Sequence, residues 1–148
     1  MDLEQLIYRS ELSPTFRRGL NGDLPDLLEQ ARRLNAARRI TGLLLVYQGC
    51  FIQLIEGRPD QLDVLISALE RDPRHRNMNA IGRRKIKQRA FPDWTMSARD
   101  LSADDERIHK RLDEAGAALP PTMSYSGVLR FLKRIWAIRF DECQFVYV

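Results

Sequence analysis

The sequence has no long apolar run and few of the residues that serve common enzyme chemistries. No segment of the 148-residue chain approaches the roughly 18 apolar residues that a membrane span needs. Cysteine occurs twice, at Cys50 and Cys143, and this spacing fits neither a disulfide framework nor a zinc site. Glu56 has no second carboxylate nearby with which to form an acid–base pair, and neither a Gly-rich phosphate loop nor a nucleophilic triad is present. These absences argue against hydrolysis and phosphoryl transfer, so we expect a protein that is not an enzyme.

Histidine is also scarce, and the charge is close to balanced. His75, in Asp72-Pro73-Arg74-His75-Arg76, is predicted to lie in a turn or at a helix end, and His109 is isolated. The net charge is +4, from 24 Lys and Arg against 20 Asp and Glu. Arginine is unusually dense in pairs, which either attract a phosphate or nucleic acid or simply keep the surface solvated. The pairs are Arg17-Arg18, Arg32-Arg33, Arg38-Arg39 and Arg83-Arg84.

The composition is that of a globular protein with reduced thiols. Hydrophobic residues make up 44% and charged residues 30% of the chain, which suits one domain with a core and a small extension. The first ten residues, MDLEQLIYRS, lack the basic-then-apolar order of a signal peptide. We therefore expect a cytoplasmic protein.

The first 100 residues show alternating strand and helix patterns. Apolar positions and turn residues predict a helix at 24–37 and another from Pro59 to near Asp72. They predict strands at Leu3–Arg9, in the hairpin Ile40–Gly57, at Arg76–Ala90 and at Trp94–Arg99, the last with Trp94, Met96 and Ala98 on one face. The order βαββαββ predicts an α+β fold: a ferredoxin-like, mixed five-stranded sheet with both helices on one face.

The last 47 residues are predicted to form two helices that cover the other face of the sheet. Ser102 begins the first, which ends near Gly116 and Pro120-Pro121, and the second begins near Ser126. The second helix is basic and amphipathic, so binding to a membrane or to a calmodulin-like partner is the alternative to packing. We divide the chain into a domain at 1–100 and a helical extension at 101–148 for output or oligomerisation. The strand-like Gln144–Val148 stays unplaced.

Three polar residues stand on otherwise apolar elements. Tyr8 lies on the first strand, Asn35 near the end of the first helix and Gln53 inside the hairpin. Singly, Tyr8 could pack with its hydroxyl at the surface, Asn35 could be a helix C-cap and Gln53 could face solvent. A buried amide without partners costs about 1–3 kcal/mol, so a buried Gln53 would need its hydrogen bonds made. Together, the phenol and two carboxamides could fix a planar polar ligand by its edge.

A run of motifs in residues 1–100 resembles the BLUF family of blue-light sensors that use flavin. The motifs, in chain order, are Tyr8 with Ser10, ARRLN at 31–35, ITGLLL at 40–45, Gly49, Phe51, Gln53, Glu56-Gly57, DPRH at 72–75, Arg89, Phe91 and Trp94-Thr95-Met96. The chain departs from the usual pattern at two places. Leu34 stands where the family often has the first of two asparagines, and Arg39 stands where a glycine commonly precedes Ile-Thr-Gly.

The resemblance implies a light-driven switch on a non-covalent flavin held between the two helices. It implies that Tyr8 donates an electron and a proton to the excited flavin. It further implies that Gln53 relays between Tyr8 and the flavin edge, and that Asn35 holds the pyrimidine side of the ring. Trp94 and Met96 match the strand whose rearrangement signals to the C-terminal helices.

Weaker expectations concern the rest of the site and the partners. Leu27 and Leu69 could line the ring, and Arg32 or Arg33 could approach the phosphate of the flavin, which we expect to be FAD in preference to FMN. We expect output through a homo-oligomer or a downstream effector protein, with no membrane and no nucleic-acid partner. The alternatives are a flavin-free binding module that acts through its basic surface and a small flavin enzyme, although no nicotinamide-binding motif is present.

Overall fold

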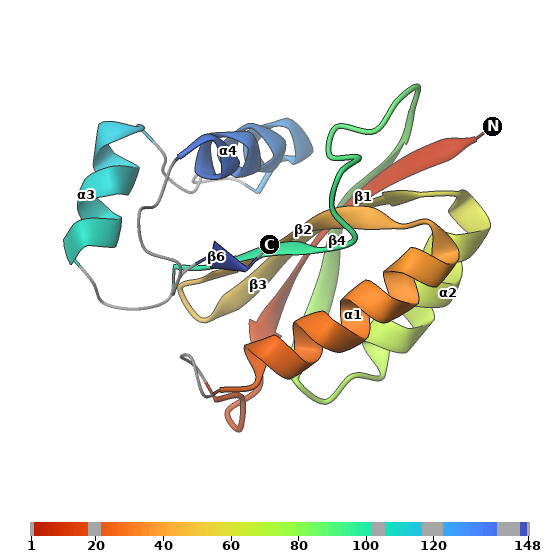
Figure 1. The fold of residues 1–148 in the computed structure, drawn as a ribbon, viewed down its shortest axis with the longest axis horizontal. Coiled ribbons are helices and arrows are strands. Elements are labelled where there is room, and N and C mark those ends of the chain that lie inside the picture. Colours follow the sequence, from red (N-terminus) through yellow and green to blue (C-terminus); the bar gives the residue numbers. More distant parts are fainter. Residues whose placement is uncertain (1, 18–21, 102–105, 117–122, 139–145, 148) are drawn as a thin grey trace.

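The molecule is built on one mixed sheet with helices on both faces (Figure 1). The computed structural model describes residues 2–17, 22–101, 106–116, 123–138 and 146–147. The sheet order is β4-β1-β3-β2-β5-β6. Its strands are β1 (Leu3–Leu12), β2 (Thr41–Tyr47), β3 (Cys50–Gly57), β4 (His75–Ile86), β5 (Ser97–Asp100) and β6 (Val146–Tyr147). The β2–β5 pair is parallel and the other neighbours are antiparallel. The four strands β4-β1-β3-β2 form the predicted ferredoxin-like core, and the parallel β5 makes the sheet mixed.

The hairpin of β2 and β3 forms the centre of this sheet. Gln48 and Gly49 both have positive φ, at 50° and 77°, which is the backbone conformation of a tight two-residue turn. All eight residues of β3 are buried, because β1 and β2 flank the strand and helices cover both of its faces. The alternation of side chains along β3 therefore sends one set of residues to each face.

Helices α1 (Leu24–Arg38) and α2 (Pro59–Glu70) cover one face of the sheet (Figure 1). Each has a proline in its first turn, where the missing N–H costs no helical hydrogen bond. Their buried leucines, among them Leu28 and Leu62, pack against Phe51 and Ile55 of β3. This layer contains the cavity described below.

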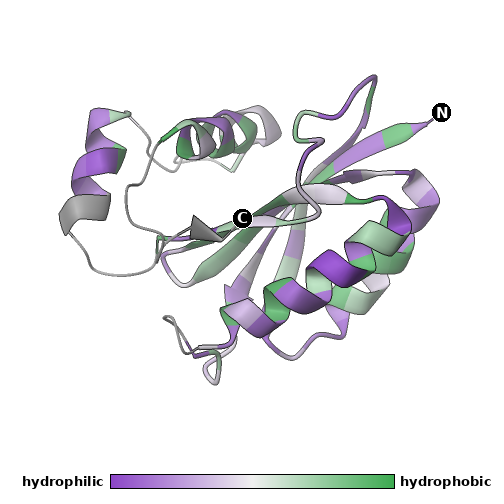
Figure 2. Ribbon diagram, viewed as in Figure 1, coloured by the Kyte–Doolittle hydropathy of each residue, from purple (hydrophilic) through white to green (hydrophobic). Residues whose placement is uncertain are grey.

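Helix α4 (Tyr125–Ala137) covers the opposite face of the sheet. Ser124 caps it, accepting a hydrogen bond from the Gly127 amide at 3.1 Å. Its Val128, Phe131, Leu132 and Ile135 share a core cluster with Ile52 and Leu54 of β3. Figure 2 shows α4 carrying both hydrophobic and hydrophilic residues, whereas α3 (Glu106–Glu114) is mainly hydrophilic and contributes Leu112 to that cluster. The prediction that C-terminal helices cover this face is confirmed for α4, whose packing accounts for its amphipathic pattern.

Several predicted boundaries differ from the structure. β1 continues to Leu12, because Glu11 and Leu12 still pair with β4. The short β6 adds a sixth strand by pairing with β5. β5 begins only at Ser97, so the alternation rule does not extend back to Trp94, which packs with the α4-side cluster while Met96 and Ala98 lie in the other. The predicted helix signals at Ser102 and Pro120-Pro121 lie outside the described residues.

Within the part of the chain that the structure describes, none of the helices has the length and apolar character to cross a membrane.

Candidate functional site

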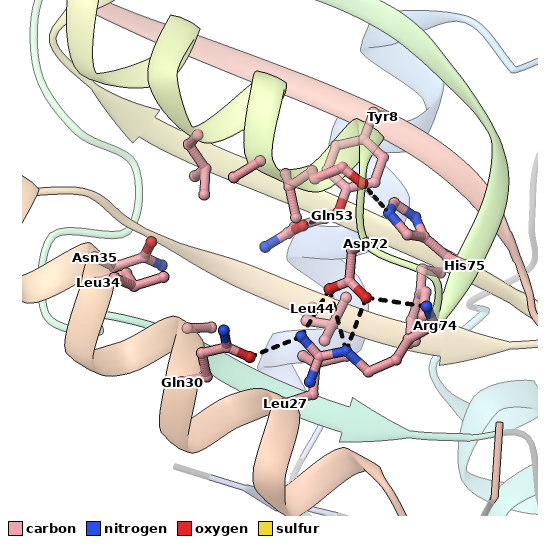
Figure 3. Close-up of a pocket in the computed structure, with 15 residues that line it drawn as sticks. Tyr8, Leu27, Gln30, Leu34, Asn35, Leu44, Gln53, Asp72, Arg74 and His75 are labelled. Carbon is pink, nitrogen blue, oxygen red and sulfur yellow. Dashed lines mark hydrogen bonds and ion pairs between the residues drawn. The ribbon is translucent and has the colours of Figure 1, made fainter.

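A cavity lies between α1, α2 and the sheet (Figure 3). Its empty volume is about 670 Å³, including the part that is open to solvent. Apolar side chains form most of its walls, and polar groups gather at its inner edge and at its mouth. The lining residues are Tyr8, Leu27, Gln30, Ala31, Leu34, Asn35, Leu44, Phe51, Gln53, Leu65, Ala68, Leu69, Asp72, Arg74 and His75.

Tyr8 and Gln53 form a buried hydrogen-bonded pair at the inner edge of the cavity. They are direct partners across the β1–β3 ladder and are only 2% and 5% exposed. The Tyr8 hydroxyl donates to Gln53 Oε1, and Gln53 Nε2 donates to Met96 Sδ at 3.6 Å. Burial, and secondarily the charge of Asp72, raises the pKa of Tyr8 well above its usual value. The phenol therefore keeps its proton at neutral pH and acts as the donor of the pair.

Asn35 is buried with one of its two polar atoms unused. Its Nδ2 donates to the Thr95 carbonyl at 2.7 Å. Its Oδ1 is buried and accepts no hydrogen bond from the described residues. An unsatisfied buried acceptor costs about 1–3 kcal/mol, so this oxygen is a ready acceptor for a ligand N–H. The helix-cap interpretation of Asn35 does not account for that placement.

The mouth of the cavity carries an ion pair that the sequence analysis missed. Arg74 contacts Asp72 at 2.7 Å and Gln30 Oε1 at 2.9 Å, so one guanidinium links the start of β4 to α1 (Figure 3). Burial disfavours ionisation of Asp72, but the hydrogen bonds and charge of Arg74 outweigh it and hold the Asp72 pKa below its usual value. The Asp-Pro-Arg spacing was the available signal, because an Asx side chain commonly bonds the backbone two residues on.

His75 lies at the start of β4, not in the predicted turn or helix end. Its Nε2 donates to the Leu69 carbonyl at 2.5 Å, and its Nδ1 lies 2.7 Å from Ser10 Oγ. Its ring centroid lies 6.2 Å from that of Tyr8. The imidazole thus fastens the end of α2 to β1 beside the cavity.

Five of the six predicted binding residues line the cavity: Tyr8, Asn35, Gln53, Leu27 and Leu69. Arg32, the sixth, does not line it, because its Nε donates to the Met96 carbonyl at 2.9 Å. Its Nη2 is buried without a partner among the described residues. Of the two predicted signalling residues, Met96 contacts Gln53, whereas Trp94 is half-buried and stacks on Phe91 with ring centroids 6.5 Å apart.

The strand that follows Met96 is anchored to α4. Ser97 Oγ accepts a hydrogen bond from Trp136 Nε1 at 3.0 Å. The Arg99 guanidinium donates to the Ile135 carbonyl and lies 5.2 Å from the centre of the Trp136 ring. Burial lowers the pKa of Arg99 to about 10, so the side chain remains cationic at neutral pH. A cation at the C-terminal carbonyls of a helix is electrostatically favourable. These contacts join the strand that follows Met96 to the C-terminal end of α4.

The geometry is that of a small α+β domain with an apolar cavity and hydrogen-bonding groups at the edge of that cavity, and comparison with known proteins identifies the family. Residues 3–97 match the BLUF family, described as sensors of blue light using FAD. The chain therefore belongs to the BLUF family of blue-light sensors, whose members bind flavin.

Individual relatives agree with this assignment. The photoactivated adenylate cyclase subunit beta of Euglena longa is 36% identical over 77 residues, covering 51% of this chain and 9% of that protein. The blue light- and temperature-regulated antirepressor BluF of Escherichia coli K12 is 31% identical over 114 residues, covering 75% of this chain and 26% of that protein. The chain thus spans about a tenth of the cyclase and a quarter of the antirepressor.

Solved structures share the architecture over most of the chain. BlrB, described as a BLUF protein in its dark state, has a TM-score of 0.64 at 29% identity and covers 92% of this chain and 96% of its own. BlsA in its photo-activated state has a TM-score of 0.73 at 21% identity, over 95% of this chain and 99% of its own, and at that identity supports the fold alone.

Proposed function

We propose that this blue-light sensor binds FAD without a covalent bond in the cavity between α1 and α2, and that Tyr8 and Gln53 are its photoactive pair. The observation that carries the proposal is the buried Tyr8–Gln53 hydrogen bond beside an unused Asn35 acceptor, all at the edge of one apolar cavity.

The residues present fit a flavin. Aliphatic side chains from both helices, including Leu27 and Leu69, offer flat apolar walls for an aromatic ring system. Asn35 Oδ1 supplies an acceptor for an N–H at the ring edge. When bound, the flavin absorbs blue light, and its excited state is a strong oxidant. Arg32, whose Nη2 has no partner among the described residues, stays a proposed phosphate contact.

The switch that we propose is a change in the orientation of the Gln53 amide. Tyr8 would donate an electron and a proton to the bound flavin and would then regain both, so the lasting change would lie in Gln53. In the present orientation Oε1 accepts from Tyr8, and Nε2 donates to Met96 Sδ. A rotated or tautomerised amide presents a different set of donors and acceptors, since a carboxamide has one end of each kind. An amide oxygen facing Met96 would find no donor on the thioether, so the Met96 contact would be lost.

The proposed output runs through β5 into α4. One rearranged hydrogen bond is worth only about 0.5–1.5 kcal/mol. It can therefore change the output only if β5 and α4 have two arrangements of nearly equal free energy. Residues 1–100 would form the sensing domain, and 101–148 the extension that changes its contact with a downstream effector or a second copy of the chain. We propose a cytoplasmic protein without enzyme activity of its own, in which the buried Cys50 stays a free thiol.

The test is the absorbance spectrum of the purified protein before and after blue light. The protein should be yellow, release FAD on denaturation, and show a small, reversible red shift of the flavin bands. A colourless protein that binds DNA with steep salt dependence would contradict the proposal in favour of a basic binding module. Steady consumption of NAD(P)H would contradict the non-enzymatic assignment.

A further inference from the structure

A series of buried, hydrogen-bonded polar side chains lies on the α4 side of the sheet, opposite the cavity. Gln5 and Glu56 face each other across the β1–β3 ladder and are 4% and 0% exposed. Gln5 Nε2 donates to Glu56 Oε2 at 2.9 Å, and Gln5 Oε1 accepts from the Tyr125 hydroxyl of α4 at 2.5 Å. One carboxamide therefore joins a strand carboxylate to the first residue of α4.

The same carboxylate holds the loop that leads to Met96. Glu56 accepts hydrogen bonds from the backbone amides of Ala90 at 2.9 Å and Phe91 at 2.8 Å. With Gln5 this gives the buried carboxylate three donors, which offsets the cost of burying its charge. The segment between β4 and β5 is thus attached to β3 by the Glu56 carboxylate on the α4 side and, at Met96, by Gln53 on the cavity side. Arg89 adds a hydrogen bond to the Glu56 backbone carbonyl at 2.7 Å.

The position of the Tyr125 ring is specific. A Cβ added at Gly82 would lie 2.6 Å from Tyr125 Cδ2, so only glycine leaves room for the ring on β4. The Arg84 guanidinium covers the ring at 4.0 Å from its centroid. Tyr125 is 7% exposed, and burial, as the main cause, raises its pKa to about 12, so the phenol remains a donor to Gln5. The seat on Gly82 and the hydrogen bond to Gln5 fix this end of α4 to the sheet.

We propose that the hydrogen-bonded residues Tyr125, Gln5 and Glu56 form a latch that couples the loop before β5 to the N-terminal end of α4. The light-driven structural change is transmitted to α4 through this latch as well as through β5. This inference rests on the proposed function, because it deepens how the same switch is transmitted. The latch lies close to the switch along both strands: Glu56 is three residues from Gln53 on β3, and Gln5 is three residues from Tyr8 on β1. Tyr8 and Gln53 are on the cavity face of the sheet, and Gln5 and Glu56 are on the α4 face. Tyr125 is a positioning residue: it touches neither the cavity nor the loop amides.

The experiment measures amide exchange by NMR in the flavin-bound protein, for wild type, Tyr125→Phe and Gly82→Ala. Tyr47→Phe is the matched control, because Tyr47 packs on Phe131 under α4 but lies outside the latch. In the dark, Tyr125→Phe should raise exchange of the Ala90 and Phe91 amides about three- to tenfold, the range for losing one hydrogen bond. Gly82→Ala, which displaces the ring and keeps the hydroxyl, should act in the same direction, and Tyr47→Phe should stay within about twofold of wild type.

The illuminated samples test the role in signalling. In wild type, blue light should speed exchange in α4, and Tyr125→Phe should lose most of that increment while keeping the red shift of the flavin. The latch proposal is wrong if Tyr125→Phe leaves the amide exchange of Ala90 and Phe91 unchanged, or if it keeps the full light-driven increase of exchange in α4. Either result would leave the proposed photoreceptor function standing. If the wild-type protein shows no spectral shift, both the proposed photoreceptor function and the proposed role of the latch in signalling are wrong. The dark exchange of Ala90 and Phe91 would still reveal whether the loop and α4 are coupled. If Gly82→Ala fails to fold, Tyr125→Phe alone decides.

Discussion

Replacing Asn35 by leucine should separate flavin affinity from the stability of the protein. The side chain is buried, donates to the Thr95 carbonyl at 2.7 Å, and leaves Oδ1 without a partner among the described residues. Leucine has a similar size and removes both polar atoms. In the flavin-free protein the loss of one hydrogen bond, about 0.5–1.5 kcal/mol, opposes the relief of one unsatisfied acceptor, about 1–3 kcal/mol. The free energy of unfolding should therefore change by between a loss of about 0.5 kcal/mol and a gain of about 2.5 kcal/mol.

Flavin binding should respond much more strongly. The bound ring would present a donor to a site that has lost its acceptor, at a cost of about 1–3 kcal/mol. At 1.4 kcal/mol per factor of ten, the dissociation constant should rise about 5- to 140-fold.

The assay pairs two measurements on flavin-free protein. Urea unfolding gives the stability, and quenching of flavin fluorescence on titration gives the affinity. Asn79→Leu, the same replacement at an exposed position of β4, is the control and should leave the affinity unchanged. An Asn35→Leu protein that binds FAD within about twofold of wild type would refute the assignment of Oδ1 as the ligand acceptor.

Three further predictions concern the switch and the tyrosines. Gln53→Leu and Tyr8→Phe should each abolish the light-induced red shift while flavin stays bound, with Tyr47→Phe as the unaffected control; a normal photocycle in either variant would contradict the photoactive pair. Met96→Leu removes the acceptor 3.6 Å from Gln53 Nε2 and should slow dark recovery about two- to tenfold, measured as decay of the red shift; an unchanged rate would mean that this contact does not favour the dark orientation. Burial raises the pKa values of Tyr8 and Tyr125 above the unfolded value of 10.0, so stability should be full below pH 10 and fall as pH rises from 10 toward 12. Urea unfolding across that range should show a shallower fall for Tyr125→Phe, and an equal slope would argue against a buried, protonated phenol.

The sequence was sufficient to predict the parts of the fold that follow from local pattern. Hydrophobic periodicity located the hairpin and both cavity helices, and the cost of burying an amide marked Gln53 as a residue in need of partners. Trp94 was placed on the wrong face because the alternation rule holds only within a strand, and β5 starts three residues later.

Interactions between distant residues were beyond local pattern. The sequence showed Glu56 as a carboxylate without an acid–base partner and as part of a family motif. Neither observation predicted its hydrogen-bond partners, which are Gln5 and the amides of Ala90 and Phe91. Nothing along the chain indicates that Tyr125 would meet Gln5, because the two are 120 positions apart and are joined only by the docking of α4. Local propensity predicts elements, and such pairings appear only when the elements pack.

The burial of every β3 side chain bears on how this protein can be altered. A strand on an open sheet usually offers one solvent-exposed face where dyes, tags or new chemistry do no harm. β3 offers none, so a protein engineer who substitutes any of its positions disturbs the packing on one side of the sheet or the other. Attachment sites belong elsewhere, and the exposed Arg130 and Lys133 of α4 are suitable, because a label there would move with the helix without entering either core.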